Sequence, residues 1–505
     1  MGILDEKAYE QRKRLIANAI AAFRKTSKKV LLTYCLLIVL VLHTISNIFT
    51  IRATHAPIQS MIDDVVQRPI RIEDRTSFAQ MGMRAKLYID FLKTGKVNSK
   101  EFNGFEEAIW NFIPRITHLR EYRLRRTSLS KDRKSRGIVM TAGKDNFEYA
   151  NHFIATVRQV FHSKLPIEVY YYGSEDLPDS MADFLESTYK DVDVIDMAKR
   201  QNPFNESVVK LDGGGWAMKP FALLTSSFDE AMLVDADTVL VMPPDDIFKS
   251  EGYKKTGTLF FQDRLAQCTG EENVPHEMHK FLKDQFGMDG PPASIKHELF
   301  WQKSCHHYQE SGLLLVDMNK PEVFGSLLLT AWMNTRQVRE YHTYQQFHGE
   351  KESFWLAFEL THQPYSFNKQ YGGTIGAEYS PHVDGFCSDH LLHFISDIQE
   401  HSIVPKIHHR RDAAVQSYGI PTGKPAWING SLRRNKLRLS KEMLYPQESI
   451  WAVDGWWEWM AEEQTFCLRN YTRQPLSSYG LQDTLTKLVT VAEKAEKHAE
   501  MADLL

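Results

Sequence analysis

The apolar residues of the chain follow two patterns, one long run near the N-terminus and short alternating runs further along. Residues 30–51 form the long run, with 22 positions and no charged side chain. A helix of that length reaches roughly 30 Å, the thickness of the hydrocarbon core of a bilayer. We therefore expect residues 30–51 to be a transmembrane signal anchor, with a buried core helix and a cleaved signal peptide as the alternatives.

Basic residues before this run predict its orientation. They are Lys7, Arg12, Lys13, Arg14, Arg24, Lys25, Lys28 and Lys29. Because positively charged flanks stay in the cytosol, residues 1–29 are predicted to be a cytosolic tail. The chain after residue 51 is predicted to lie on the other side of the membrane.

Residues 52–135 have the pattern of a helical stem. Apolar positions recur every three or four residues over 76–95 and over 105–124, which favours two amphipathic helices. Residues 120–136 are rich in Lys and Arg and poor in apolar residues. We interpret them as a solvated linker rather than as a contact to an anionic partner.

From residue 136 onward, short apolar runs alternate with helical patterns. Strands are predicted at 137–143, 167–173, 192–198 and 230–241, helices at 149–163 and 176–189, and a glycine-rich turn that enters a helix at 212–227. This alternation is typical of βαβ units, so we predict an α/β catalytic domain over 136–440 with a mostly parallel central sheet. In such sheets ligands bind beyond the carboxyl ends of the strands.

After residue 250 the pattern is mixed. It predicts strands at 257–265 and 311–319, helices at 321–338 and 351–362, and a C-terminal extension over 441–505 that ends in a polar-faced helix from residue 481. The chain of 505 residues carries a formal net charge of -3 and is 43% apolar. The apolar content allows a sizeable core, and the near-zero charge argues against a nucleic-acid binder.

Two further features agree with a location outside the cytosol. Four of the five cysteines follow the long apolar run, namely Cys268, Cys305, Cys387 and Cys467. In an oxidising compartment they allow two disulfides in three possible pairings, and the alternative is four buried thiols. Candidate glycosylation sites in Asn-X-Ser/Thr triplets are Asn205, Asn429 and Asn470.

The candidate chemistry centres on two aspartates, Asp235 and Asp237, at the end of a predicted strand. Their apolar flanks distinguish them from a generic acidic turn, and two solvated turn aspartates are the alternative. Carboxylates one residue apart can reach one divalent cation, and oxygen ligands suit Mg²⁺ or Mn²⁺. Such an ion would neutralise a diphosphate and improve it as a leaving group. Lys219, where the glycine-rich turn enters its helix, could also meet phosphate charge.

Five ordered blocks resemble the fungal Golgi α-mannosyltransferases of glycosyltransferase family 71, of the α-1,3-mannosyltransferase type. The blocks are GWAMKPFALLTSSFDEAMLVDADTVLVMPPDDIF (215–248), YQESGLLLVDMNK (308–320), GEKESFW (349–355), LLHF (391–394) and GKPAWINGSL (423–432). The resemblance covers residues 137–435 and leaves out the stem and the C-terminal tail. It implies a GT-A fold, a GDP-mannose donor, Mn²⁺, retention of anomeric configuration, and a type II Golgi membrane protein with a lumenal catalytic domain.

The resemblance also implies roles for single residues. Asp235 and Asp237 would hold the metal and the donor diphosphate, and His393 would be a third metal ligand, with His390 as its rival. The residues expected to line the donor site are Thr141, Ala142, Gly143, Lys219, Ser311 and Gly312. Glu310 and Glu352 are acids that could stabilise positive charge at the anomeric carbon, and the alternative for each is a salt bridge. Asn429 falls inside a matching block, which favours a structural or acceptor role over a glycan there.

We therefore predict a Golgi enzyme that adds α-1,3-linked mannose to mannosylated N- or O-glycans, with other Golgi glycosyltransferases as candidate partners. The alternatives are an α-1,2 linkage, a non-catalytic subunit of a mannan-building complex, and a nucleotide-sugar hydrolase. Retention could use a covalent carboxylate intermediate. It could also be a front-face reaction in which the leaving phosphate helps to deprotonate the acceptor. We favour the second, because no paired nucleophile stands out in the sequence.

Overall fold

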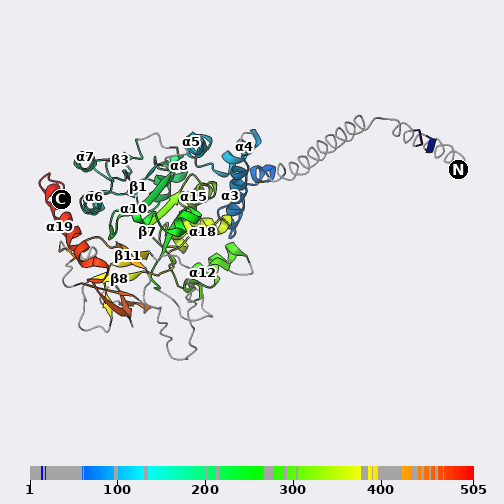
Figure 1. Ribbon diagram of the computed structural model, residues 1–505. Coiled ribbons are helices and arrows are strands. Elements are labelled where there is room, and N and C mark those ends of the chain that lie inside the picture. The colour runs from blue at the N-terminus through cyan, green and yellow to red at the C-terminus, as the bar shows by residue number, and fades with distance from the viewer. Residues whose placement is uncertain are drawn as a thin grey trace, which may run out of the picture. The chain divides into compact units, whose positions relative to one another are not determined.

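A computed structural model describes most of the chain from residue 60 onward (Figure 1). The described residues are 13–14, 17–18, 60, 62–95, 100–129, 135–199, 203–211, 215–266, 277–287, 293–302, 305–376, 385–388, 390–395, 423–434, 442–444, 449–453, 456–460, 465–469 and 471–505. The predicted signal anchor, residues 30–51, lies outside them. No helix among the described residues is long and apolar enough to cross a membrane. Pro69–Leu505 form one compact unit, in which the described residues of the predicted stem from Pro69 onward pack together with the predicted catalytic domain and C-terminal extension.

Six strands form the central sheet, in the order β3-β2-β1-β4-β7-β6. Their bounds are β1 Arg136–Thr141, β2 Ile167–Tyr171, β3 Val192–Asp196, β4 Glu230–Asp235, β6 Thr258–Gln262 and β7 Gln309–Asp317. The first four strands in that order are parallel, and β7 runs antiparallel to both of its neighbours. The predicted mostly parallel sheet is therefore confirmed.

Helices cover both faces of this sheet (Figure 1). The helices are α3 Ser77–Thr94, α4 Lys100–Ile109, α5 Ile116–Leu129, α6 Phe147–Gln159, α7 Asp179–Thr188, α8 Glu206–Val209, α9 Met218–Thr225, α10 Pro244–Ile247, α11 Glu251–Thr256, α12 Glu277–Phe286, α13 Ala293–Lys296, α14 Leu299–Gln302, α15 Pro321–Met333, α16 Arg336–Val338, α17 Tyr344–Gln346, α18 Lys351–Thr361 and α19 Leu481–Glu500. Met140 of β1 shares a hydrophobic cluster with residues of α6, α7 and α19. Its neighbour Val139 is equally buried and points to the opposite face, where α9, α15 and α18 contact the sheet.

Among the described residues there are two further sheets, one of six strands and one of three. The first has the order β15-β12-β8-β10-β11-β5 and the second β13-β14-β9. Their bounds are β5 Thr238–Leu240, β8 Gly373–Gly376, β9 Phe386–Cys387, β10 Leu391–Ile395, β11 Lys424–Asn429, β12 Ile450–Val453, β13 Trp456–Met460, β14 Thr465–Arg469 and β15 Thr472–Pro475. Cys387 and Cys467 form a disulfide between β9 and β14, and Cys305 is also disulfide-bonded. The predicted use of disulfides is confirmed for these three cysteines.

Two predicted elements are divided in the structure. The strand predicted at 230–241 is two strands in different sheets, β4 and β5, and the chain changes sheet at Asp235–Asp237. The single helix predicted at 105–124 is also two helices in the structure, because α4 ends at Ile109 and α5 begins at Ile116. Pro114 stands between them, and proline lacks the N–H and disfavours helical geometry in the residue before it.

The prediction that residues 120–136 form a solvated linker is wrong. Its first half belongs to α5, and both Arg120 and Arg123 are buried there. Arg123 donates to four backbone carbonyls at distances of 2.6–2.9 Å, those of Leu223, Leu224, Ser226 and Phe228. These carbonyls lie at and just after the C-terminal end of α9, where a helix leaves carbonyl groups without partners. Arg123 therefore ties the predicted stem to the helix that carries Lys219.

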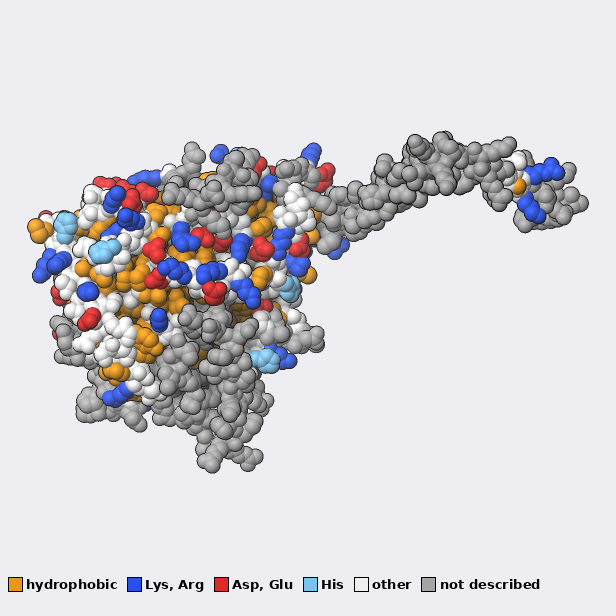
Figure 2. All heavy atoms as spheres, viewed as in Figure 1, with side chains coloured by type: hydrophobic (Ala, Val, Ile, Leu, Met, Phe, Trp, Pro, Cys, Tyr) orange, Lys and Arg blue, Asp and Glu red, His pale blue; other side chains and the backbone are white. Residues whose placement is uncertain are grey.

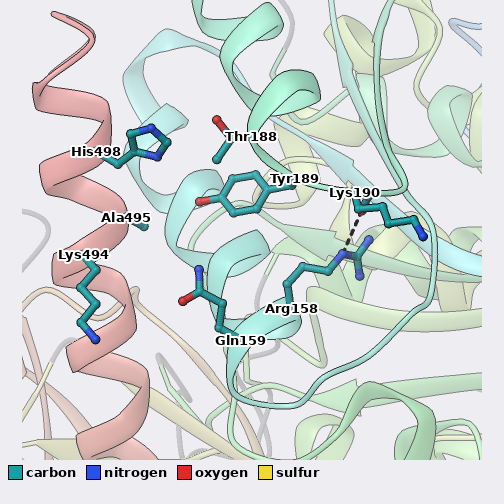
Figure 3. Close-up of a pocket in the computed structure, with 8 residues that line it drawn as sticks. All are labelled: Arg158, Gln159, Thr188, Tyr189, Lys190, Lys494, Ala495 and His498. Atoms are coloured by element: carbon teal, nitrogen blue, oxygen red, sulfur yellow. Dashed lines mark hydrogen bonds between the residues drawn. The ribbon is translucent and has the colours of Figure 1, made fainter.

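Basic side chains gather in one pocket of the unit (Figure 3). It has a volume of about 290 Å³ and is lined by Arg158, Gln159, Thr188, Tyr189, Lys190, Lys494, Ala495 and His498. Arg158 is held by three backbone carbonyls, those of Ser163, Lys190 and Asp191. These segments enter β2 and β3, so the pocket lies at the amino end of the parallel strands, opposite Asp235. Elsewhere, on the face shown in Figure 2, positively and negatively charged side chains are interspersed.

Replacing Arg123 tests the contact between α5 and α9. We expect Arg123→Met to lower the free energy of unfolding by about 3 kcal/mol, because it leaves buried carbonyls without donors. The exposed Arg115, just before α5, offers a matched control. Thermal unfolding of both variants checks this, and equal midpoints for Arg123→Met and Arg115→Met would contradict it.

Candidate functional site

The ends of three strands of the central sheet meet around Asp235. Thr141 of β1 is in register with Asp235 of β4, and on the other side Leu313 of β7 pairs with Val234. The residues that follow Thr141 and those that precede Leu313 therefore flank the aspartate. The structure thus brings the predicted donor-site segments 141–143 and 311–312 to the same edge of the sheet as the aspartate pair.

The turn that carries the two aspartates is fixed by backbone contacts. The carbonyl oxygen of Asp237 accepts from the backbone N–H of Ser431 at 2.8 Å, and the Thr238 hydroxyl donates to the Gly312 carbonyl at 2.7 Å. The side chains of Asp235 and Asp237 remain partly exposed, that of Asp235 by 25%. The turn is therefore held from two sheets while its carboxylates keep access to solvent.

Lys219 links one of these aspartates to an acid that the sequence did not single out. Its Nζ lies 2.6 Å from Asp235 Oδ1 and 2.7 Å from Glu350 Oε1. Ser311 Oγ also donates to that Glu350 oxygen, at 2.8 Å. Burial lowers the pKa of Lys219, but Asp235 and Glu350 outweigh this effect and hold it above its usual range. The ammonium group is therefore charged and shared between two carboxylates.

The carboxylates outnumber the positive charge at this point. Burial, with the neighbouring Asp237 and Glu350, raises the pKa of Asp235 to about 7, although Lys219 acts in the opposite direction. Three carboxylates, of which Asp235 and Asp237 are partly exposed, share one ammonium group as the positive charge nearest to Asp235, and this favours an additional cation. Carboxylate oxygens are the ligands that Mg²⁺ and Mn²⁺ prefer. The donor set of Asp235 and Asp237 thus fits a divalent cation.

A second ion pair lies beside the first. Lys351 Nζ is 2.6 Å from Asp263 Oδ2, and Asp263 follows the last residue of β6. Burial raises the pKa of Asp263, but Lys351, His307 and Arg264 outweigh it and keep the pKa below the usual range.

Glu310 is the predicted acid that shares this electrostatic environment. One carboxylate oxygen of Glu310 accepts the Gly312 N–H at 2.9 Å. Burial and the nearby Asp263 raise the pKa of Glu310, against the effect of Lys351. The structure therefore places Glu310 with the site.

Glu352, the other predicted acid, is turned away from this group. Its side chain is fully buried, and it accepts the backbone N–H of Tyr308 at 2.9 Å and the Trp355 indole N–H at 2.5 Å. Burial raises its pKa to about 7. These contacts brace the start of β7 against α18. Glu350 rather than Glu352 contributes the carboxylate that meets Lys219.

The predicted third metal ligand is not assembled with the aspartates. His393 is 1% exposed, neither ring nitrogen has a hydrogen-bond partner, and its ring stacks on Trp427 with centroids 4.1 Å apart. Burial lowers its pKa to about 3, so the imidazole is neutral. The rival His390 has its Nε2 2.7 Å from the Arg433 carbonyl oxygen. Among the described residues, however, Asp235, Asp237 and His393 do not form a set with all ligand atoms within 4.8 Å.

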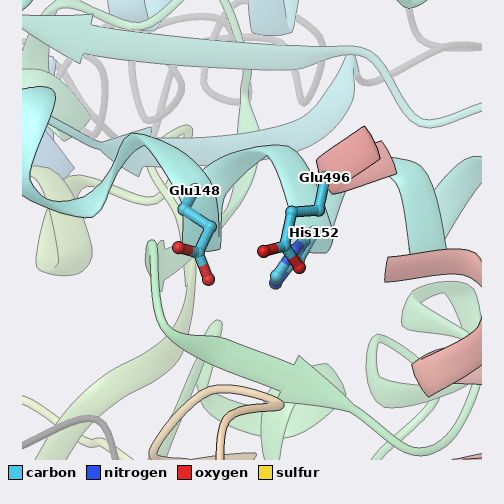
Figure 4. Close-up of side chains that lie close together, drawn as sticks. All are labelled: Glu148, His152 and Glu496. Atoms are coloured by element: carbon cyan, nitrogen blue, oxygen red, sulfur yellow. The ribbon is translucent and has the colours of Figure 1, made fainter. Parts of the chain in front are cut away.

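A different group of described residues has its possible ligand atoms within 4.8 Å of one another, and it lies between α6 and α19 (Figure 4). It consists of Glu148, His152 and Glu496, and the guanidinium of Arg433 already donates to both carboxylates, at 2.6 and 2.7 Å. Arg433 supplies the positive charge that a metal ion would bring. We therefore interpret this cluster as a clamp that holds the C-terminal helix α19 on α6.

Three site residues escaped the sequence analysis, namely Asp263, Glu350 and Lys351. A signal was present for each, because Asp263 lies within the last three residues of a predicted strand and the other two stand in the matching block 349–355. Of the glycosylation candidates, Asn205 caps the short helix α8 through a contact to the Ser207 N–H, and Asn429 lies in β11. Asn470 lies outside the described residues.

Comparison with known proteins identifies the family of the chain. Residues 135–394, about half of the sequence, match the family described as "Mannosyltransferase putative". The chain is 29% identical over 302 residues to "Putative alpha-1,3-mannosyltransferase MNN1" of Candida albicans, which covers 52% of this chain and 36% of that protein. It is 26% identical over 353 residues to alpha-1,3-mannosyltransferase MNN1 of Saccharomyces cerevisiae, covering 60% and 43%. The predicted resemblance to fungal α-1,3-mannosyltransferases is confirmed.

These matches are partial in length. The aligned part of this chain spans about a third to a half of the relatives named above. A solved galactosyltransferase, LgtC in complex with donor and acceptor sugar analogues, aligns with 14% identity over 44% of this chain and 70% of its own, with a TM-score of 0.28. That likeness is too loose to carry an argument, and the sequence relatives alone carry the family assignment.

Acid sensitivity tests the clamp of Figure 4. Burial, with Arg433 beside it, lowers the pKa of His152 from 6.5 to about 4, against the effect of Glu496. Between pH 6.5 and 4 the unfolded chain binds a proton at His152 and the folded chain does not. Stability is therefore lost as the pH falls through this window, by up to about 1.4 kcal/mol per pH unit.

The variant His152→Gln removes this titration. We expect its thermal unfolding midpoint to fall less steeply than that of the wild type between pH 6.5 and 4.5. His118→Gln, at an exposed position, is the control and should keep the wild-type slope. Parallel curves for wild type and His152→Gln would rule out this source of acid sensitivity.

The buried ion pairs of Lys219 are tested by its removal. Lys219→Met should lower the free energy of unfolding by about 3 kcal/mol, because it leaves two carboxylates without their shared partner. Lys249 pairs with Asp246 at the surface, where its side chain is 70% exposed. Lys249→Met should change stability by less than about 0.5 kcal/mol. Similar losses in both variants, measured by denaturant unfolding, would contradict the role given to Lys219.

Proposed function

We propose that this chain, which belongs to the mannosyltransferase family matched over residues 135–394, transfers mannose from GDP-mannose to a mannosylated glycan and forms an α-1,3 linkage. One observation carries the proposal. Within the matched region, the ammonium group of Lys219 pairs with both Asp235 and Glu350 at the carboxyl end of a parallel strand, and Asp237 stands two residues after Asp235. Such an edge is where α/β sheets bind nucleotides and their phosphates.

The proposed donor site uses both sides of β4. Asp235 and Asp237 would hold Mn²⁺ or Mg²⁺, which when bound would neutralise the diphosphate of the leaving GDP. The Lys219 ammonium would add positive charge toward the phosphates, as lysines do in many phosphate sites. The nucleotide would extend toward residues 141–143, because β1 adjoins β4 on that side. The sugar would lie toward Ser311 and Gly312 on the side of β7.

The reaction breaks the bond between the anomeric carbon and the diphosphate oxygen and forms a bond to an acceptor hydroxyl. GDP leaves with the electron pair, and the hydroxyl proton passes to a phosphate oxygen of the leaving group. This front-face course retains the anomeric configuration. Glu310, held by the Gly312 N–H, would stabilise positive charge at the anomeric carbon. Its burial supports this role, because charges interact more strongly away from water.

We further propose that the enzyme is a type II protein of the Golgi membrane with a GT-A catalytic unit in the lumen. The Cys387–Cys467 disulfide supports an oxidising compartment. The apolar run at 30–51 and its basic flank support a signal anchor. An α-1,2 linkage and a non-catalytic role in a mannan-building complex are the alternatives to this function.

The test is a transfer assay on the full chain with GDP-mannose, a panel of mannosides, and Mn²⁺ or a chelator. We expect metal-dependent transfer and an α-1,3 product by NMR. Asp235→Asn and Asp237→Asn should each reduce kcat/KM by about 100-fold or more, the size typical of losing one electrostatic contact to a developing charge.

Asp246→Asn is the matched control, because Asp246 is an exposed acid of the same block that pairs with Lys249. It should keep wild-type activity. An α-1,2 product would replace the proposed linkage. Folded wild-type protein that binds GDP but transfers to no mannoside would favour the non-catalytic role.

A further inference from the structure

One tryptophan at the candidate site keeps half of its surface in water. Trp216 is 50% exposed, whereas Trp110, Trp355, Trp427 and Trp451 are below 2%. Exposed apolar surface costs roughly 25 cal/mol per Å² relative to burial. Large exposed aromatic side chains are therefore candidates for binding surfaces, where tryptophan is enriched among the residues that dominate affinity.

The indole of Trp216 is held in place although it is exposed. It packs directly over Gly349, where a Cβ atom would come within 2.6 Å of the Trp216 Cε3 atom. Gly349 also has a φ of +72°, in the left-handed region that residues with a side chain rarely adopt. The rings of His348 and Tyr344 flank the indole, with centroids at 5.0 and 6.5 Å. The exposed face is thus pre-organised, which lowers the entropic cost of binding.

This platform adjoins the two ion pairs. Trp216 lies three residues before Lys219, and its carbonyl oxygen accepts the Lys219 N–H at 3.3 Å. Gly349 directly precedes Glu350, which also contacts Lys219. On the far side, the ring centroids of His348 and His307 are 5.9 Å apart. His307 in turn is one of the neighbours, after Lys351, that lower the pKa of Asp263. The indole is therefore anchored between the two segments that carry the Lys219 ion pairs.

We propose that Trp216 is the stacking platform for a hexose ring of the acceptor glycan, an inference that rests on the mannosyltransferase function proposed above. One face of a pyranose ring presents C–H groups, which pack favourably on the electron-rich face of an indole. The hydroxyl groups at the ring edge need hydrogen-bond partners. The imidazoles of His348 and His307 can donate and accept at that edge.

The position of Trp216 favours the acceptor over the donor. In the proposed donor site the nucleotide lies toward β1, on one side of β4. The neighbours of Trp216 belong to the other side, because Gly349 precedes α18, which packs on β7. A ring stacked on Trp216 would thus lie on the β7 side of β4, near the donor sugar and the leaving phosphate and away from the nucleoside.

The test compares Trp216→Ala and Trp216→Tyr with the wild-type full chain. We expect Trp216→Ala to raise the KM for the mannoside acceptor about 10-fold, the usual size of a lost stacking contact. The KM for GDP-mannose and the rate of donor hydrolysis should stay unchanged. Trp216→Tyr should restore most of the acceptor affinity, because it keeps an aromatic face.

Trp459 provides a matched control, because it is also half exposed, at 51%, but lies on β13 of the small third sheet. Trp459→Ala should keep the wild-type KM for the acceptor. An unchanged acceptor KM in Trp216→Ala would overturn the proposal. So would an equal rise in Trp459→Ala, or a rise in the KM for GDP-mannose, which would mean that the indole stacks on the nucleotide.

A binding experiment separates this inference from the proposed function. Saturation-transfer NMR with methyl α-mannoside and mannobiose, without any donor, reports contact of the sugar with the protein. Signals in the wild type that Trp216→Ala loses and Trp216→Tyr regains would support the platform even if no transfer is observed. Transfer by the wild type with no difference between the variants, in either assay, would leave the enzyme function intact and remove the platform.

Discussion

The candidate site depends on one ammonium group, that of Lys219, which stands between the carboxylates of Asp235 and Glu350. Carboxylates this close would repel each other in a partly buried setting, and the shared cation allows both to remain at one point. Its position is set by α9. The C-terminal end of that helix is fixed by Arg123, which reaches from α5 to four carbonyls at and after the helix end. Residues far outside the aspartate motif therefore decide where the charge of Lys219 lies.

The sequence predicts the part of the site that depends on local pattern. Strands buried on both faces give continuous apolar runs, so their ends are visible, and two aspartates at such an end are conspicuous. The sequence does not indicate that Glu350 rather than Glu352 belongs to the site, because both acids stand in the same matching block. The side chains of two residues that are two positions apart on a helix are rotated by about 200° around the helix axis. Glu352 therefore points into the core beside Trp355, while Glu350, at the residue before α18, meets Lys219.

Other predictions failed where tertiary contacts overrule the local pattern. An apolar run does not reveal that a strand leaves one sheet and enters another, as the chain does between β4 and β5. The basic segment after residue 120 has the composition of a solvated linker, yet the burial of Arg123 is possible because the end of α9 offers backbone carbonyls as acceptors. That partner is about a hundred residues away in sequence, so no local window contains it.

The match to the family ends at residue 394, but the structure of the site does not. The turn that carries Asp237 is held by the backbone N–H of Ser431, which follows β11, and β11 pairs with β5 immediately after the aspartates. Arg433 then joins this segment to α6 and α19 through Glu148 and Glu496. Since α6 lies under the central sheet, the last helix of the chain braces the same turn from behind. The described residues from β11 to Arg433 are therefore part of the scaffold that positions the aspartate pair.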